Sequence, residues 1–229
     1  MHLYIANQLY SSWSLRPWLL MTALDIPFEQ TVIAMGFPDT RRQMLDVSPT
    51  GKMPCLHDGD VRVWESLAII DYLADNFPDK RVWPAEKAAR AHARAASAEM
   101  HAGFTALRSA CPMNLGKRFR PRDMGLDVAA DVTRVEGLWA EAREKFGSGG
   151  DFLYGDFCAA DAMYAPVVTR LDTYQIPVMP QARVYMDAVL NHPAFVKWRE
   201  AGLAEPWTLP HYDEGWMPAE IFHHPNGDA

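Results

Sequence analysis

A proline at the start of a strand-like run constrains the fold of this chain more than any other feature. Residues 48–56 read Ser-Pro-Thr-Gly-Lys-Met-Pro-Cys-Leu, and the run ends near Asp58. Pro54 has no backbone N–H to donate to a sheet, so it must begin this strand or lie on a sheet edge. Because the residue before a proline stays extended, the backbone N–H and C=O of Met53 are left free to pair with an extended ligand.

A polar pair, Glu65 and Ser66, comes directly before apolar residues at helical spacing, which are Leu67, Ile70, Leu73, Ala74 and Phe77. This spacing predicts that the pair opens a helix. Free N–H groups at a helix start bind carboxylates, and Glu65 can accept an ammonium group. Met53, Pro54 and this pair can together read the backbone and charged ends of a small peptide. The alternative is that Pro54 is a turn proline and Ser66 only a helix cap.

The N-terminal third alternates between strand and helix patterns. Strand-like runs cover 3–6, 28–35, 54–58 and 61–64, and helical runs cover 15–24, 40–46 and 65–77. The order βαβαββα predicts a mixed sheet covered by helices, with the first two strands parallel. We expect one domain over 1–80 and a proline-containing linker over 81–86.

Beyond the linker, the pattern is almost entirely helical, with runs at 85–109, 128–146, 159–174 and 181–190. We therefore expect an all-helical domain over 87–210 and a loosely attached C-terminal extension over 211–229. Within this domain Cys158 stands where a helix cap is expected, and Asp161 follows three residues later. A thiol accepts hydrogen bonds weakly, so Asp161 should supply most of the capping.

Composition limits the classes of partner. The formal net charge of −7 argues against nucleic-acid binding, and no apolar run is long enough for a membrane span. Three cysteines without C-x-x-C spacing suit a reducing compartment, so we expect a cytoplasmic protein. His92 and His101 share a predicted helix, but without a third ligand we expect no metal site.

In this order, the segments resemble the glutathione transferase superfamily. Residues 10–17, Tyr-Ser-Ser-Trp-Ser-Leu-Arg-Pro, are similar to the Ser-Ser-Cys-Ser-x-Arg signature of its zeta class, with Trp13 in the place of the cysteine. The resemblance implies an α+β, thioredoxin-like N-terminal domain followed by an all-α helical bundle. It also implies glutathione as co-substrate, with no metal, a small electrophile as second substrate, and a homodimer.

The resemblance places the chemistry in residues 7–14, where a serine hydroxyl activates the glutathione thiol. The free thiol has a pKa near 8.5, and lowering it by about two units needs about 2.7 kcal/mol. A hydroxyl donor and a helix N-terminus together supply about that much. Zeta-class sequences favour Ser11 and theta-like sequences favour Ser12, so both remain candidates. Ser14 is expected to cap the following helix.

The same resemblance assigns the two substrate sites. Glutathione would be held by Lys52, Met53, Pro54, Glu65 and Ser66. The second-substrate pocket would include Trp13, Phe37, Phe104 and Arg108, a mainly apolar set that suits an apolar electrophile. Arg16 either steers an anionic substrate or pairs with a carboxylate beneath the loop.

The sequence therefore predicts a cytoplasmic glutathione S-transferase of the detoxification type. Two alternatives remain open at this point. One is a glutathione-dependent isomerase of the maleylacetoacetate type, for which replacement of the zeta cysteine by Trp13 weakens the case. The other is a non-catalytic member of the fold that binds proteins.

Overall fold

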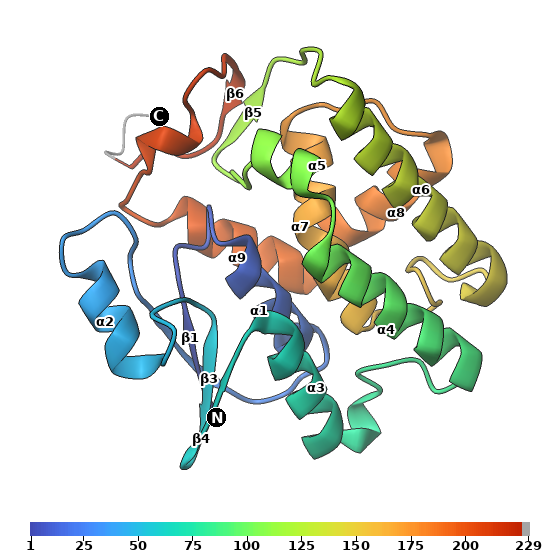
Figure 1. Ribbon diagram of the computed structural model, residues 1–229, viewed down its shortest axis with the longest axis horizontal. Helices are drawn as coiled ribbons and strands as arrows, with labels where there is room; N and C mark the ends of the chain where they lie inside the picture. Colours follow the sequence, from blue (N-terminus) through green and yellow to red (C-terminus); the bar gives the residue numbers. More distant parts are fainter. Residues whose placement is uncertain (226–229) are drawn as a thin grey trace.

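The computed structural model describes residues 1–225 and begins with a four-stranded mixed sheet (Figure 1). Its strands are β1 (His2–Ile5), β2 (Glu29–Val32), β3 (Cys55–Asp58) and β4 (Val61–Trp64), in the spatial order β2-β1-β3-β4. β1 and β2 are parallel, as a helical crossover requires, and the other pairs are antiparallel. The predicted thioredoxin-like βαβαββα order is confirmed.

Alternation along the strands sends side chains to two separate cores. Leu3 and Ile5 point toward α1 (Ser12–Ala23) and α3 (Ser66–Asn76), whose apolar faces complete the larger core. On the other face of the sheet, Met44 of α2 (Thr40–Val47) packs with Ala6, Ile33, Met53 and Cys55. The sheet is therefore covered on both faces, and the end of β1 lies between the two layers.

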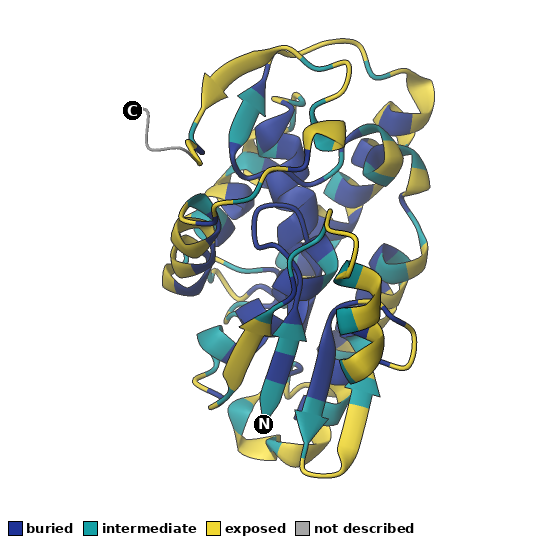
Figure 2. Cartoon of the chain, turned by 90° about the vertical axis from the view of Figure 1, so that its left-hand side faces the viewer, coloured by how far each residue is buried: buried dark blue, intermediate teal, exposed yellow. Residues whose placement is uncertain are grey.

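The second domain is built mainly of helices, as predicted. They are α4 (Lys87–Ala102), α5 (Thr105–Ala110), α6 (Leu126–Phe146), α7 (Ala159–Thr173), α8 (Pro180–Leu190) and α9 (Pro193–Leu203). Buried residues run through the middle of the molecule, while exposed residues lie at its rim (Figure 2). All of α7 except Asp172 is buried, and this helix packs against both α1 and α4. α7 therefore joins the helical domain to the sheet domain.

The cap of α7 agrees with the prediction from sequence. Asp161 accepts a hydrogen bond from the backbone N–H of Cys158 at 2.9 Å and another from Leu153 at 3.1 Å. The Cys158 side chain completes a capping box. Among residues 1–225, no helix is both long and apolar enough to cross a membrane.

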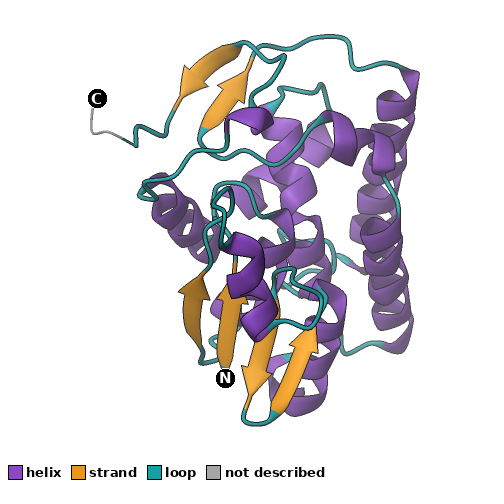
Figure 3. Ribbon diagram, turned by 60° about the vertical axis from the view of Figure 1, so that its left-hand side comes forward, coloured by secondary structure: helices purple, strands orange, loops and turns teal. Residues whose placement is uncertain are grey.

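The helical domain also contains a small sheet that the sequence did not indicate. β5 (Lys117–Phe119) pairs with β6 (Pro218–Ile221) in antiparallel fashion, so the described part of the C-terminal extension is anchored and the expectation of loose attachment was wrong (Figure 3). The 3-10 helices are η1 (Pro78–Lys80) and η2 (Pro210–Tyr212). The remainder of the predicted extension, 226–229, lies outside the described residues.

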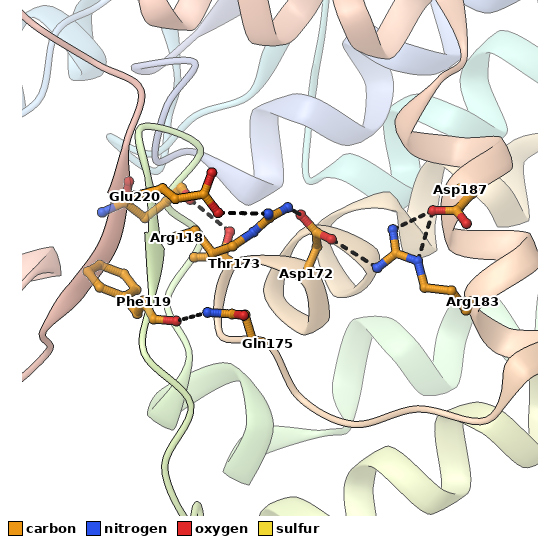
Figure 4. Close-up of polar contacts among 9 residues, drawn as sticks. Arg118, Phe119, Asp172, Thr173, Gln175, Arg183, Asp187 and Glu220 are labelled. Carbon is orange, nitrogen blue, oxygen red and sulfur yellow. Dashed lines mark hydrogen bonds and ion pairs between the residues drawn. The ribbon is translucent and has the colours of Figure 1, made fainter.

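An ion-pair network secures this anchor to the bundle. Arg118 of β5 contacts both Asp172 of α7 and Glu220 of β6 at 2.9 Å (Figure 4). Arg183 of α8 contacts the other oxygen of Asp172 at 2.9 Å and also pairs with Asp187. Asp172 thus links the small sheet to two helices of the bundle.

Candidate active site

Residues from the C-terminal part of the chain contact the loop between β1 and α1 and hold it in place. Glu205 accepts a hydrogen bond from the Gln8 N–H at 2.6 Å, and the indole of Trp198 donates to the Gln8 carbonyl at 2.9 Å. The ring of Tyr10 packs against Tyr212 with centroids 4.9 Å apart. These contacts fix the loop that presents the two predicted serines.

Ser11 is the N-cap of α1. Its hydroxyl donates to the Ser14 hydroxyl at 2.8 Å and accepts from the Ser14 N–H at 3.4 Å. Ser14 in turn accepts a hydrogen bond from the Ala6 N–H at 3.1 Å. The expectation that Ser14 caps the helix was wrong, because the helix begins at Ser12 and the cap falls one residue before it.

Ser12 is differently engaged. Its hydroxyl oxygen accepts a hydrogen bond from the Arg170 guanidinium at 3.2 Å. No acceptor among residues 1–225 takes its hydroxyl proton, which is therefore free for a molecule in the adjoining cavity. The two serines both line this cavity, but only Ser12 has its proton free.

The cavity next to the serines has a volume of about 490 Å³. Its apolar lining includes Ala6, Tyr10, Trp13, Met35, Met44, Met53, Pro112, Met113 and Tyr212. Its polar lining includes Ser11, Ser12, Lys52, Thr105, Arg108, Ser109 and Arg170. Trp13 and Arg108, two of the predicted pocket residues, are thus brought together here.

The other two predicted pocket residues, Phe37 and Phe104, do not line this cavity, and their part in substrate binding stays a prediction. Phe37 lies in the loop before α2 and is 48% exposed. Phe104 is buried just before α5, where it belongs to the hydrophobic core. Helical periodicity marks a residue as apolar-facing without distinguishing core from cavity.

A second pocket, of about 240 Å³, adjoins the first and shares Trp13, Lys52 and Met53 with it. All the residues predicted to hold glutathione line it, namely Lys52, Met53, Pro54, Glu65 and Ser66. Pro54 follows a cis peptide bond and directly precedes β3. The folded chain thus brings the five predicted residues, which come from two segments of the sequence, into one pocket.

The start of α3 forms one wall of this pocket. Glu65 has a φ of 72°, a conformation that non-glycine residues rarely adopt and that is found mainly at functional sites. The Ser66 hydroxyl is fully buried and has no partner among residues 1–225. A strained carboxylate-bearing residue and an unpaired hydroxyl at a helix start suit a ligand with a charged end.

His101 of α4 completes the second pocket and was missed as a site residue. Its Nε2 lies 3.7 Å from a Glu65 carboxylate oxygen, and its ring meets Trp13 edge-on at 5.2 Å. Burial lowers the pKa of His101 below its usual range. In sequence it was considered only with His92, whose ring instead packs against Tyr154. Among residues 1–225, no group of three metal-ligating side chains lies together.

Arg16 lies behind the site and is almost fully buried, at 1% exposure. Its guanidinium donates to the Met163 carbonyl at 3.1 Å and to the Ser12 carbonyl at 3.2 Å. Burial, reinforced by the charges of Arg170 and Arg108, lowers the pKa of Arg16 well below its usual range. No carboxylate of residues 1–225 lies within 4.0 Å, so the alternative in which Arg16 pairs with an acid is excluded for that part of the chain.

Two further arginines reach the larger cavity from the helical domain. Arg170 donates to the Cys111 and Pro166 carbonyls at 2.8 and 3.0 Å, and burial lowers its pKa to about 10. Arg108 donates to backbone carbonyls at the end of α4 and lies over the ring of Trp13, 4.9 Å from its centroid. Burial also lowers the pKa of Arg108. Arg170 was not singled out from sequence.

Comparisons with known proteins agree with this arrangement. The family model "Glutathione S-transferase, N-terminal domain" matches residues 10–76. The chain is 29% identical over 196 residues to a probable maleylacetoacetate isomerase of Caenorhabditis elegans, which covers 82% of this chain and 90% of that protein. It is 36% identical over 78 residues to glutathione S-transferase GstB of Escherichia coli, covering 33% of this chain and 38% of that protein.

Solved structures share the fold over nearly the whole chain. A zeta-class bacterial glutathione S-transferase described as maleyl pyruvate isomerase superposes with a TM-score of 0.68 at 19% identity, covering 91% of this chain and 100% of that one. A glutathione transferase homologue from Burkholderia with bound glutathione gives 0.65 at 20% identity, covering 88% and 97%. Residues 10–76 therefore match the N-terminal domain family of the glutathione S-transferases, and nearly the whole chain shares the fold of glutathione S-transferase structures.

Proposed function

We propose that this protein is a glutathione S-transferase that binds glutathione in the 240 Å³ pocket and an electrophile in the adjoining 490 Å³ cavity. The observation that carries the proposal is the free hydroxyl proton of Ser12 in the cavity wall, beside the pocket that gathers Met53, Pro54, Glu65 and Ser66. A superfamily relative with bound glutathione and the same fold supports the identity of the tripeptide.

Glutathione is placed by matching its groups to the pocket. The extended backbone at Met53 pairs with the peptide, and Glu65 and Ser66 at the start of α3 hold its γ-glutamyl end. Lys52 lies in both cavities, where its ammonium group can meet the glycine carboxylate. This placement directs the cysteine thiol toward the cavity that contains Ser12.

The thiol is activated by Ser12 rather than Ser11. The Ser11 hydroxyl already donates to Ser14, so donation to a thiolate would break an internal hydrogen bond at the helix cap. Donation from the Ser12 hydroxyl to a thiolate would break no internal hydrogen bond. The Ser12 oxygen already accepts a hydrogen bond from the cationic Arg170, and this makes the hydroxyl a stronger donor. A hydrogen bond to a charged group contributes about 1.5–3 kcal/mol, enough to lower the thiol pKa by about one to two units.

The bound thiolate then attacks the electrophile, either by displacement or by addition. The sulfur lone pair of the thiolate forms a C–S bond to the electrophilic carbon. In a displacement, the leaving group departs with the electrons of its own bond. In an addition, the neighbouring atom takes up the electron pair and then a proton from water. The thiol proton is released to solvent, so no general base is required.

A glutathione-dependent isomerase is the second candidate, because the relative that covers 82% of this chain is named a probable maleylacetoacetate isomerase. In that reaction the thiolate adds to a double bond, a single bond rotates, and the thiolate leaves. Product analysis separates the two functions, since an isomerase returns free glutathione and a transferase consumes it. The proposal further includes homodimeric assembly and a cytoplasmic location, with assembly checked by sedimentation equilibrium.

Calorimetric titration with glutathione tests the binding site. Wild-type protein should bind, and Glu65→Ala and Ser66→Ala should each weaken binding by about tenfold or more, because each removes a polar partner from a charged end. Glu144→Ala, an exposed substitution on α6, is the matched control and should bind as wild type does. If wild-type protein binds no glutathione, the proposal fails, and the protein-binding alternative takes its place.

A further inference from the structure

Tyr212 is a cavity-lining residue that was not singled out from sequence, and it comes from the C-terminal segment of the chain. It is the last residue of η2, is half-buried, and lines the 490 Å³ cavity together with Ser12. Its ring packs against Tyr10 with centroids 4.9 Å apart. The C-terminal segment therefore contributes a phenol to the larger cavity.

Contacts on both sides of Tyr212 fix its position. The carboxylate of the next residue, Asp213, accepts a hydrogen bond from the Asn114 side chain at 2.8 Å and also pairs with Lys117. The backbone N–H of Tyr212 donates to the Leu209 carbonyl at 2.9 Å, and the chain then enters β6, which pairs with β5. Because the segment is held at several points, the Tyr212 hydroxyl is preorganised at the cavity wall.

The hydroxyl of Tyr212 has no internal partner. No side chain or backbone group of residues 1–225 forms a hydrogen bond with it, and it is not one of the fully buried polar atoms. Burial raises the pKa of Tyr212 above its usual value of 10.0, while the positive charge of Arg170 acts in the opposite direction. The group is therefore a protonated phenol at neutral pH, and its proton is free for a molecule in the cavity.

Tyr10 also lines the cavity but has a different environment. Burial raises the pKa of Tyr10, and the negative charges of Asp213 and Glu205 raise it further. The charge that acts on Tyr212 is instead that of Arg170, the residue that also donates to the serine hydroxyl beside the glutathione pocket. Of the two phenols, Tyr212 is thus the one placed on the side of the reaction.

We propose that the Tyr212 hydroxyl donates a hydrogen bond, and then its proton, to the carbonyl oxygen of a conjugated carbonyl substrate, and that such compounds are the class this site accelerates most. This inference rests on the proposed function and names a catalytic residue and a substrate class for it. A fixed donor is most effective where negative charge develops in the transition state, and addition to a conjugated carbonyl compound places that charge on oxygen.

In this addition the thiolate lone pair forms a C–S bond to the β-carbon. The electrons of the C=C bond form a new double bond between the α-carbon and the carbonyl carbon, and the carbonyl π electrons move to oxygen. Tyr212 gives its proton to that oxygen, which leaves an enol and a phenolate. The α-carbon then takes a proton from water, and the phenolate recovers the enol proton. The proton that the thiol released to solvent balances the one taken from water.

Turnover of two substrates with the same aromatic body tests this role. Addition is measured with 4-phenylbut-3-en-2-one and displacement with benzyl chloride. Tyr212→Phe should lower kcat for the ketone by about 100-fold and leave its KM within about twofold, because the donor acts mainly as charge develops on oxygen. It should leave kcat for benzyl chloride unchanged, since that substrate has no oxygen. Tyr72→Phe removes a phenol hydroxyl outside both pockets and should change neither rate.

Binding of the saturated ketone 4-phenylbutan-2-one, measured by calorimetry without glutathione, tests the same hydroxyl independently of turnover. Tyr212→Phe should weaken this binding by about fivefold, the effect of one lost hydrogen bond. Binding of butylbenzene, which lacks the oxygen, should stay unchanged and shows that the cavity of the variant is intact.

The inference is overturned if Tyr212→Phe lowers turnover of both substrates equally, or if it changes neither turnover nor binding of the ketones. It is also overturned if the wild-type protein binds glutathione and converts benzyl chloride but not the unsaturated ketone. If the saturated ketone binds through Tyr212 but glutathione does not bind, the proposed function fails, while the assignment of Tyr212 as the donor to the carbonyl group stands.

Discussion

Glu205 is a buried carboxyl group directly beneath the loop that carries the two serines, and its titration should be visible in protein stability. It is 7% exposed and accepts a hydrogen bond from the Gln8 N–H at 2.6 Å. Its second oxygen is buried and has no partner among residues 1–225. Burial raises the pKa of Glu205 to about 7, although the N–H groups of Gln8 and Leu9 act in the opposite direction.

The size of the effect follows from the two pKa values. A rise from 4.5 in the unfolded chain to about 7 in the folded protein corresponds to about 3 kcal/mol. Because the folded state holds this proton more tightly, the contribution to stability is fully present below about pH 4.5. It is lost as the pH rises through about 7.

Glu205→Gln removes the titration and keeps an oxygen that can accept from the Gln8 N–H. Urea unfolding of both proteins at about pH 5 and about pH 8 gives two differences in unfolding free energy, variant minus wild type. This difference should be about 3 kcal/mol larger at the higher pH than at the lower one. The pH-dependent contributions of groups present in both proteins cancel in the difference. The absolute difference also contains the burial of a new amide, so only its change with pH is interpreted.

Glu200→Gln on the exposed surface of α9 is the control, and its difference from wild type should not change with pH. If the Glu205→Gln difference is equally independent of pH, burial does not raise the pKa of Glu205 in the folded protein. A flat result would mean that the loop opens around the carboxylate and hydrates it at little cost. The serine loop would then be less firmly held than the contacts of Glu205 suggest.

Two further predictions concern structural contacts. Cys158→Ser should raise the unfolding free energy by about 1 kcal/mol, because a hydroxyl caps a helix better than a thiol does. Cys111 is a buried thiol that caps no helix N-terminus, so Cys111→Ser should lower the unfolding free energy. Thermal unfolding of both variants checks this. Asp172→Asn should destabilise the protein by about 1 kcal/mol near neutral pH, because it weakens the contacts with Arg118 and Arg183. Although burial opposes ionisation, those arginines hold the pKa of Asp172 below its usual value of about 3.8. The loss should therefore be full above about pH 4 and shrink as the pH falls below the usual value. Unfolding at several pH values measures it, and a pH-independent loss would contradict the assignment.

Local chemistry explains why the sheet domain was predictable. Pro54 marks the start of a strand through its missing N–H, and the spacing after Ser66 is helical, so both elements lie where the residues themselves require. The same segments bring together all five predicted glutathione contacts, since each is adjacent to one of these two element boundaries. Their role in binding stays a prediction until it is measured.

Tertiary structure decided the features that the sequence missed. β5 and β6 are three and four residues long and lie about one hundred residues apart, so neither produces a recognisable strand pattern alone. Arg16, Arg108 and Arg170 come from three different helices, which sequence alone does not bring together. Because nearly all of α7 is buried, no pattern of apolar and polar residues in the sequence indicates where the Arg170 side chain points. Phe37 is half-exposed and Phe104 is buried, and neither lines the larger cavity. The sequence could not indicate this, because an aromatic side chain suits core, surface and cavity equally well.

The role of Ser12 is tested by pH titration of the thiolate absorbance of glutathione bound to the wild-type protein, Ser12→Ala and Ser11→Ala. We expect Ser12→Ala to raise the pKa of the bound thiol by about one to two units, toward the free value near 8.5. Ser11→Ala should leave this pKa unchanged and instead lower stability by about 1 kcal/mol through loss of the α1 cap. An unchanged thiol pKa in Ser12→Ala, or a rise only in Ser11→Ala, would contradict the assignment of Ser12 as the activating residue.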